Sequence, residues 1–332
     1  MAVVALGLSS QHDIGVTALP DNGPLTYVAL GDSIASGHGL GTTEGPVEAD
    51  AAFGQPGANC QRSSGLTAAE KAYPDLVRDA LARRGRQVQF HKLACTGHTT
   101  ADLLTFQLPA AERLLGQSAG VVTLTIGAND YRFSDPVTYV AALNPSPRIY
   151  ALWRSRIEAG VEANLATALA RLGRGHPERR ILVTQYYNPF NADSSVYGLV
   201  PGCHRPTPTG ALGCADRVAG AIEGLNGSIL HAVDSYQSER SAGWASAVVV
   251  GGVREAFEHH GAPRPNCGSG APEVEQSWIQ SPRRALLVEG LLGEQRLGSG
   301  NDCFHPNPGG HRELARLVLA RLAVGGRNAL SP

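Results

Sequence analysis

Apolar, β-branched runs alternate with helical patterns along most of this chain. Five short runs predict strands, and five longer segments with apolar residues at helical spacing predict helices. Strands are expected at 25–31, 87–94, 120–126, 180–186 and 245–250, and helices at 67–84, 100–116, 148–173, 215–239 and 308–324. Alternation of this kind is typical of a parallel sheet covered by helices on both faces, so we expect an α/β fold.

Three stretches interrupt the alternation: 39–65, 187–214 and 260–301, which are rich in Gly, Pro or small polar residues. Loops of this length are uncommon unless they are functional or cross-linked, and each one contains or adjoins cysteines. We therefore interpret them as disulfide-pinned excursions around one compact core. Because no linker divides the chain, we expect a single domain over 25–326, preceded by an N-terminal extension or signal remnant at 1–24.

The composition changes this picture little, but it excludes some partners. Hydrophobic residues make up 42% of the 332 positions and charged residues 17%, which is enough to build a sizeable core and argues against disorder. The net charge of −1 provides no electrostatic footprint for nucleic acid or an anionic membrane. No apolar run approaches the roughly 20 residues that span a bilayer. Nothing in the sequence requires more than a monomer.

Six cysteines are spread widely along the chain without a C-x-x-C pair, so zinc or thioredoxin-like chemistry is not expected. An even number of scattered cysteines favours disulfides in an oxidising compartment, and buried thiols in a reduced protein are the alternative. Export would require a signal peptide, yet the apolar run 3–8 is short and no Lys or Arg precedes Arg62. We expect a secreted or extracytoplasmic protein, although no clear signal peptide is visible.

Ser33 follows the first strand-like run, where a sharp turn into a helix would expose its hydroxyl. Far downstream, Asp302 and His305 lie three residues apart, so the carboxylate can orient the imidazole as a base for the serine. Taken alone, Ser33 also fits a helix N-cap and His305 an ordinary loop histidine. Other histidines are weaker candidates for the base: His38, His98 and His311.

Gly97 and Asn129 each follow another predicted strand and are candidate oxyanion donors. A glycine lets a backbone N–H approach a substrate closely, and an asparagine amide is a neutral, fixed donor. Plain turns are the alternative for both sites, and we expect Asp32 and Asp130 to make structural hydrogen bonds to loop backbone. Ligands bind beyond the carboxyl ends of parallel strands, so Ser33, Gly97 and Asn129 should share one edge of the sheet.

Four blocks in this order resemble the SGNH (GDSL) hydrolase family. Gly31-Asp32-Ser33 is similar to its first block, Gly97 to the glycine of its second, residues 127–130 to its third, and Asp302 with His305 to its last. The resemblance extends over most of 25–324. The spread of cysteines and the segments 60–63 and 122–127 look like the secreted bacterial lipase/esterase branch.

This resemblance implies a flavodoxin-like, three-layer α/β/α sandwich with a parallel sheet. It implies cleavage of carboxylic esters, of lipids or of short-to-medium acyl chains, through an acyl-enzyme and without a metal or other cofactor. Ser33 would be the nucleophile, His305 the base and Asp302 the acid that orients it. The oxyanion hole would consist of Ser33, Gly97 and Asn129.

The resemblance also implies sequential disulfides: Cys60–Cys95, Cys203–Cys214 and Cys267–Cys303. Two of these would brace the loops of the expected oxyanion hole and of the acid–base pair. An acyltransferase or a carbohydrate deacetylase with the same acyl-enzyme is one alternative function. A non-catalytic binding module on the same fold is another, although an intact set of Ser33, Asn129 and His305 argues against it.

Overall fold

A single parallel sheet forms the centre of the molecule. The computed structural model describes residues 24–38, 40, 66–131, 147–189, 214–258, 260 and 305–323. The strands are β1 (Leu25–Gly31), β2 (Val88–Lys92), β3 (Gly120–Thr125), β4 (Arg179–Thr184) and β5 (Ser246–Val250), in the order β2-β1-β3-β4-β5. Every neighbouring pair is parallel. The five predicted strands are confirmed, with bounds that agree within two residues at either end.

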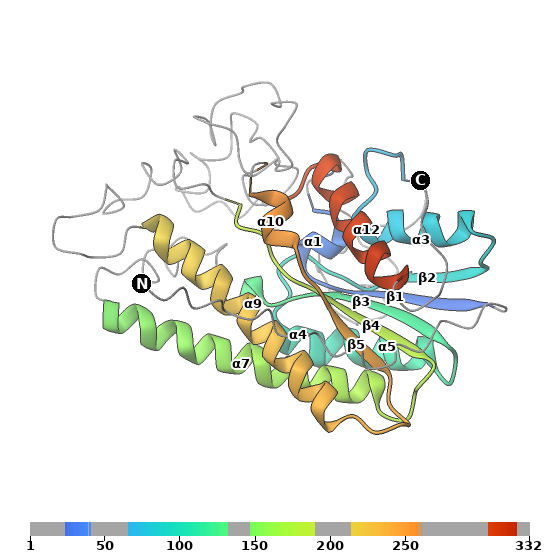
Figure 1. The fold of residues 1–332 in the computed structure, drawn as a ribbon. Helices are drawn as coiled ribbons and strands as arrows, with labels where there is room; N and C mark the ends of the chain where they lie inside the picture. The colour runs from blue at the N-terminus through green and yellow to red at the C-terminus, as the bar shows by residue number, and fades with distance from the viewer. Residues whose placement is uncertain are drawn as a thin grey trace, which may run out of the picture.

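Helices cover both faces of this sheet (Figure 1). On one face lie α1 (Ser33–Ser36), α3 (Tyr73–Arg83), α10 (Val253–Phe257) and α12 (Pro308–Ala323). On the other lie α4 (Thr100–Asp102), α5 (Leu108–Leu115), α7 (Pro147–Gly173) and α9 (Cys214–Glu239). This arrangement confirms the three-layer α/β/α fold with a parallel sheet. The strand order reverses between β1 and β3, so the crossovers leave in opposite directions and a crevice is expected at their carboxyl ends.

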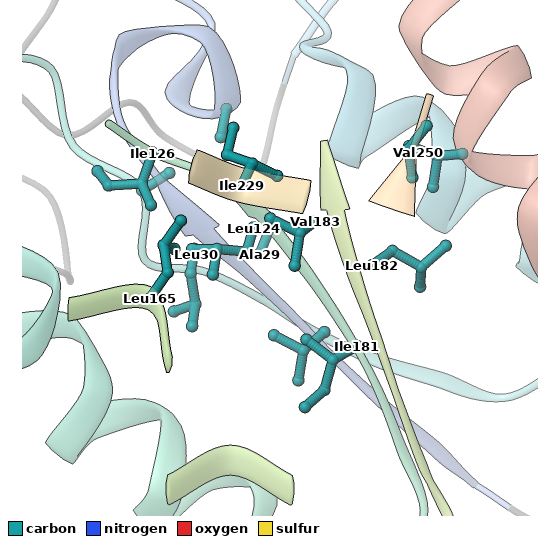
Figure 2. Packing of buried hydrophobic residues seen from close by; sticks show 14 of the residues in the cluster. Ala29, Leu30, Leu124, Ile126, Leu165, Ile181, Leu182, Val183, Ile229 and Val250 are labelled. Atoms are coloured by element: carbon teal, nitrogen blue, oxygen red, sulfur yellow. The ribbon is translucent and has the colours of Figure 1, made fainter. Parts of the chain in front are cut away.

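The core lies between the sheet and its two helical layers. Figure 2 shows Leu30 of β1, Leu124 of β3 and Val183 of β4 close to Leu165 of α7 and Ile229 of α9, and all five side chains are buried. The residues of β1, β3 and β4 are buried throughout, as expected for strands covered on both faces. A sheet packed in this way is a rigid platform for the loops at its edge.

Helical segments differ from the prediction where short-range chemistry intervenes. The helix expected at 67–84 begins only at Tyr73, where the Asp75 carboxylate accepts the Ala72 N–H at 3.0 Å. The helix expected at 100–116 is divided into α4, a π-helical turn η1 (Leu103–Gln107) and α5. The turn into a helix that was predicted at Ser33 is confirmed by α1. Two elements were not predicted because they are too short to show helical periodicity: α10 and the 3-10 turn η2 (Ala128–Tyr131).

Several predictions fall on parts of the chain that the structure does not describe. Residues 1–23 lie outside the described residues, as do nearly all of 39–65, 190–213 and 261–300. The disulfide-pinned loops and the N-terminal extension therefore stay predictions. Among the described residues, no helix combines the length and the apolar character needed to cross a membrane.

Candidate active site

The turn that carries Ser33 joins the end of β1 to the start of α1. Gly31 adopts a φ of +142°, and a Cβ atom there would lie 2.2 Å from the carbonyl oxygen of Thr125 in β3. Only glycine can place its backbone so close to that oxygen. The Asp32 N–H donates to the same oxygen at 2.9 Å, so the end of β3 holds the turn in place.

Asp32 holds the first turn of α1 through its side chain. Its Oδ1 accepts the Ile34 N–H at 2.9 Å as a helix cap, and its Oδ2 accepts the Tyr186 hydroxyl. Burial raises the pKa of the Asp32 carboxyl to about 6, although hydrogen bonds from Tyr186 and Ile34 and the charge of His305 lower it. A structural hydrogen bond from backbone to Asp32 was predicted and is confirmed, although the donor belongs to the first turn of α1 and not to a loop.

Three hydrogen bonds to its carbonyl oxygen hold the backbone of Ser33 in place. That oxygen accepts the N–H groups of Gly37 and His38, each at 3.0 Å, and the Ser36 hydroxyl at 3.0 Å. Gly37, with a φ of +91°, ends the helix in the left-handed conformation. These bonds fix the backbone of Ser33, and the residue is 9% exposed at the carboxyl edge of the sheet.

Gly97 lies in a tight turn after β2. The His98 N–H donates to the Cys95 carbonyl at 3.3 Å, and the Cys95 N–H donates to the Gly31 carbonyl at 3.1 Å. The second bond ties this turn directly to the one that carries Ser33. Gly97 has a φ of +83°, and among the described residues beyond its chain neighbours none places an atom within 4 Å of where a Cβ would stand.

Asn129 lies in η2, directly after β3, and contacts the Gly97 turn. Its Nδ2 donates to the His98 carbonyl at 2.9 Å. An amide nitrogen carries two hydrogens, so this bond fixes the orientation of the amide and a second N–H can serve an oxyanion. Its neighbour Asp130 accepts the backbone N–H and the hydroxyl of Thr100, at 2.9 and 2.6 Å. That contact confirms the structural role predicted for Asp130.

His305 lies three residues before the start of α12, and its ring contacts that of His38, which follows α1. Its ring centroid lies 4.6 Å from that of His38, and its charge lowers the pKa of Asp32, the neighbour of Ser33. The Asn307 side chain caps α12, because its Oδ1 accepts the N–H groups of Gly309 and Gly310 at 2.8 and 3.1 Å. The start of the last helix is therefore anchored two residues after the candidate base.

The remaining histidines contribute differently from the candidate base. His311 is buried inside α12, where its Nδ1 accepts the Tyr73 N–H at 3.2 Å and burial lowers the pKa of its imidazole to about 3. His311 therefore stays neutral near pH 7. His38 was predicted to be a weak candidate on a loop, and the contact of its ring with His305 could not be found from sequence spacing.

Asp302, the predicted acid, lies outside the described residues, and so do Cys60, Cys203, Cys267 and Cys303. Cys95 is disulfide-bonded. The three proposed pairings stay predictions, since each includes at least one cysteine that the structure does not describe. Within the described part of the chain, no three His, Cys, Asp or Glu side chains form a group that could hold a metal ion.

Sequence reasoning missed three buried polar side chains behind these turns. Tyr186 follows β4 and donates to Asp32, while Asn226 of α9 holds the Tyr186 backbone with two hydrogen bonds of 2.8 Å. Gln107 of η1 bonds both backbone groups of Gly31. A sequence signal exists only for Gln107, because Pro109 follows it inside a helical pattern and predicts a local break.

Comparison with curated proteins finds relatives among bacterial lipases. The chain is 28% identical over 162 residues to "Lipase" of Streptomyces rimosus, covering 48% of this chain and 52% of that protein. It is 26% identical over 175 residues to "Lipase 1" of Streptomyces coelicolor, covering 52% of this chain and 56% of that protein. The chain thus spans about half the length of the curated relatives that it matches.

Solved structures show the same fold. A phospholipase A1 from Streptomyces albidoflavus NA297 superimposes with a TM-score of 0.53 at 21% identity, covering 89% of this chain and 98% of the other. An extracellular lipase from Streptomyces rimosus gives a TM-score of 0.52 at 16% identity, covering 89% and 99%. The model of the GDSL-like lipase/acylhydrolase family matches residues 29–238, which is more than half of the chain. The chain therefore belongs to the GDSL-like lipase/acylhydrolase family.

Proposed function

We propose that this protein is a serine hydrolase that cleaves carboxylic esters, of lipids or of short-to-medium acyl chains. Membership of the family and the lipase names of two relatives support the reaction class. The observation that carries the proposal is the hydrogen bond from the Asn129 amide to the His98 carbonyl, at 2.9 Å. This bond connects Asn129, the proposed side-chain donor, to the residue that follows Gly97, a proposed backbone donor. Both donors lie beside the turn of the proposed nucleophile, Ser33.

In the first half of the reaction, the Ser33 hydroxyl attacks the ester carbonyl and His305 takes its proton. The carbonyl oxygen becomes an oxyanion, which accepts hydrogen bonds from the backbone N–H groups of Ser33 and Gly97 and from the Asn129 amide. Such fixed donors stabilise the transition state, because they need no reorganisation as the charge develops. Removal of one donor typically raises the barrier by about 2.7–4 kcal/mol.

In the second half, His305 returns the proton to the leaving alkoxide, and the acyl group stays on Ser33. Water then attacks the acyl-enzyme, with His305 again acting as the base. The carboxylic acid product is released and the Ser33 hydroxyl is restored. Asp302 would orient the imidazole and stabilise its charged form. These steps involve no cofactor or metal ion.

We also propose that the protein acts outside the cytoplasm. One structural neighbour is described as an extracellular lipase, and Cys95 is disulfide-bonded. Disulfides persist mainly in oxidising compartments. Cys60 is the partner that we propose for Cys95, with Cys203–Cys214 and Cys267–Cys303 as the other pairs.

Hydrolysis of p-nitrophenyl esters from acetate to palmitate tests the proposed function. Ser33→Ala should abolish turnover and labelling by a fluorophosphonate, because the attacking oxygen is gone. Ser238→Ala is the matched control, since its hydroxyl donates to the Ser235 carbonyl at 2.8 Å near the end of α9, which leads into the start of β5 and so lies at the opposite edge of the sheet. The chain-length profile would separate a lipase from a short-chain esterase.

The flanking residues sharpen this test. Asp302→Asn should retain more activity than His305→Ala, because the imidazole performs the proton transfer and the acid only orients it. Turnover that survives Ser33→Ala would disprove the assigned nucleophile. A folded, oxidised wild-type protein without turnover would instead direct attention to acyl transfer, tested with alcohol or glycan acceptors.

A further inference from the structure

Gln107 makes three hydrogen bonds at the base of the candidate site. Its Oε1 accepts the Gly31 N–H at 2.8 Å, and its Nε2 donates to the Gly31 carbonyl at 2.7 Å. The same nitrogen contacts Nδ1 of His98 at 2.9 Å. An amide nitrogen only donates, so Nδ1 of His98 is the acceptor in this bond. Gln107 is 0% exposed, and these contacts satisfy both polar atoms of its amide.

The partners of Gln107 are neighbours of all three proposed oxyanion donors. Gly31 lies two residues before Ser33, and His98 directly follows Gly97. The His98 carbonyl accepts the Asn129 amide at 2.9 Å. One buried amide thus connects the loops that follow β1, β2 and β3, each of which carries one of the proposed donors.

The local fold of Gln107 has an identifiable cause. Gln107 ends the π-helical turn η1, in which the Leu108 N–H bonds the Leu103 carbonyl instead of the usual carbonyl four residues back. Pro109 has no N–H and cannot continue a regular helix, so a wider turn accommodates it. π-Helical turns are rare and frequently occur at functional sites. Here the turn directs a glutamine side chain at the end of a buried strand.

We propose that Gln107 is a positioning residue, which sets the Ser33 turn and the Gly97–Asn129 donors at the spacing that the reaction needs. This inference rests on the proposed ester hydrolysis. The amide acts through Gly31 and His98, and its effect is geometric: small misplacements of catalytic groups cost large factors in rate. A fully bonded buried network is the kind of support that keeps such groups rigid.

The test compares Gln107→Met with Gln237→Met. Gln237 is the matched control, because its Nε2 also donates from a helix to a strand carbonyl, that of Ala247, but on α9 and away from the site. For Gln107→Met we expect kcat per labelled active site to fall more than about tenfold, with KM changed by less than about threefold. The rate of fluorophosphonate labelling of Ser33 should fall in parallel. Gln237→Met should keep both rates within about twofold of wild type.

Gln107→Glu is a second variant of nearly the same shape, and its kcat should depend on pH in a way that distinguishes the two possible roles of Gln107. The introduced carboxylate, when ionised, only accepts hydrogen bonds and would repel the Gly31 carbonyl, whereas the protonated carboxyl can donate again. The ratio of the kcat of this variant to that of wild type should therefore rise as the pH is lowered. A purely structural role of Gln107 would lower the melting temperature without this pH-dependent recovery of kcat.

The outcomes separate this proposal from the proposed function. A folded Gln107→Met with kcat and labelling rate within about twofold of wild type overturns the positioning role, and so does an equal loss in Gln237→Met. If neither Gln107 variant folds, Gln107 serves the fold and the proposal fails. A wild-type protein that neither hydrolyses esters nor reacts with the fluorophosphonate would overturn the proposed function itself.

Discussion

Asp32 lies next to the proposed nucleophile, yet its hydrogen bonds are directed into the fold. It is 1% exposed, caps Ile34 and accepts from Tyr186. Its neighbours include His305, which lowers the pKa of the Asp32 carboxyl, and Asp130, which raises it slightly. The dominant cause of its raised pKa is burial, and this has a consequence for stability.

Between about pH 3.8 and pH 6 the folded protein holds a proton on Asp32 that the unfolded chain has released. The contribution of Asp32 to the free energy of unfolding therefore rises as pH falls through 6 and is complete below 3.8. Asp32→Asn keeps a good capping residue but cannot ionise. As the pH rises from 3 to 7, the free energy of unfolding of the variant should increase by about 3 kcal/mol relative to that of wild type. Urea unfolding at a series of pH values measures this difference, and a pH-independent difference would contradict it.

At the scale of elements, the proposed base depends on how α12 begins. His305 is followed by Pro306, and the side chain of Asn307 then bonds the N–H groups of Gly309 and Gly310. Hydrogen bonds of this kind satisfy donors that a helix leaves without partners at its first turn. The cap therefore stabilises α12 and fixes the backbone immediately after His305.

Removal of this cap should affect both stability and rate. Asn307→Ala is expected to lower the free energy of unfolding by about 1 kcal/mol. It should also lower kcat more than KM, because the base would lose its fixed position. Asn307→Asp, which retains a capping oxygen, is the control and should stay close to wild type in urea unfolding and in ester hydrolysis. Full activity in Asn307→Ala would mean that His305 is held independently of the cap.

At the scale of the whole molecule, the strand order decides which loops meet. The neighbouring strands β2, β1 and β3 end at one edge, so loops far apart in sequence carry Gly97, Ser33 and Asn129 to one place. Cys95 lies two residues before Gly97 and is disulfide-bonded. The cross-link is therefore attached to the loop that carries Gly97, and none of the five strands that the structure describes contains a cysteine.

Reduction should therefore abolish activity before it unfolds the protein. In a titration with dithiothreitol, ester hydrolysis should fall at concentrations that leave the far-ultraviolet circular dichroism unchanged. We expect this because the cross-link is attached to a loop and not to a strand of the buried sheet. The Ser33→Ala variant, titrated in parallel, provides the spectroscopic baseline. Simultaneous loss of activity and of secondary structure would show that the cross-link supports the whole fold.

The strands β1 and β3 could be read from the chain because each is a short apolar run buried by helices. The long helices α7 and α9 could be predicted because segments of 27 and 26 residues run without a helix-breaking proline after their first position. By contrast, α10 and η2 contain only five and four residues, which is too few to show a period. The π-helical turn escaped prediction because its cause, Pro109, indicates a break but not its geometry.

The sequence by itself determined the alternation of strands and helices, the family and the candidate residues Ser33, Gly97 and Asn129, because apolar periodicity and short motifs are local properties. Only the tertiary structure decided that the Asn129 amide binds the His98 carbonyl and that Gln107 binds the Gly31 backbone. Gln107 and Gly31 are 76 positions apart in the chain, so no local pattern relates them. Their contact follows from strand order and packing, which arise only when the whole sheet has assembled.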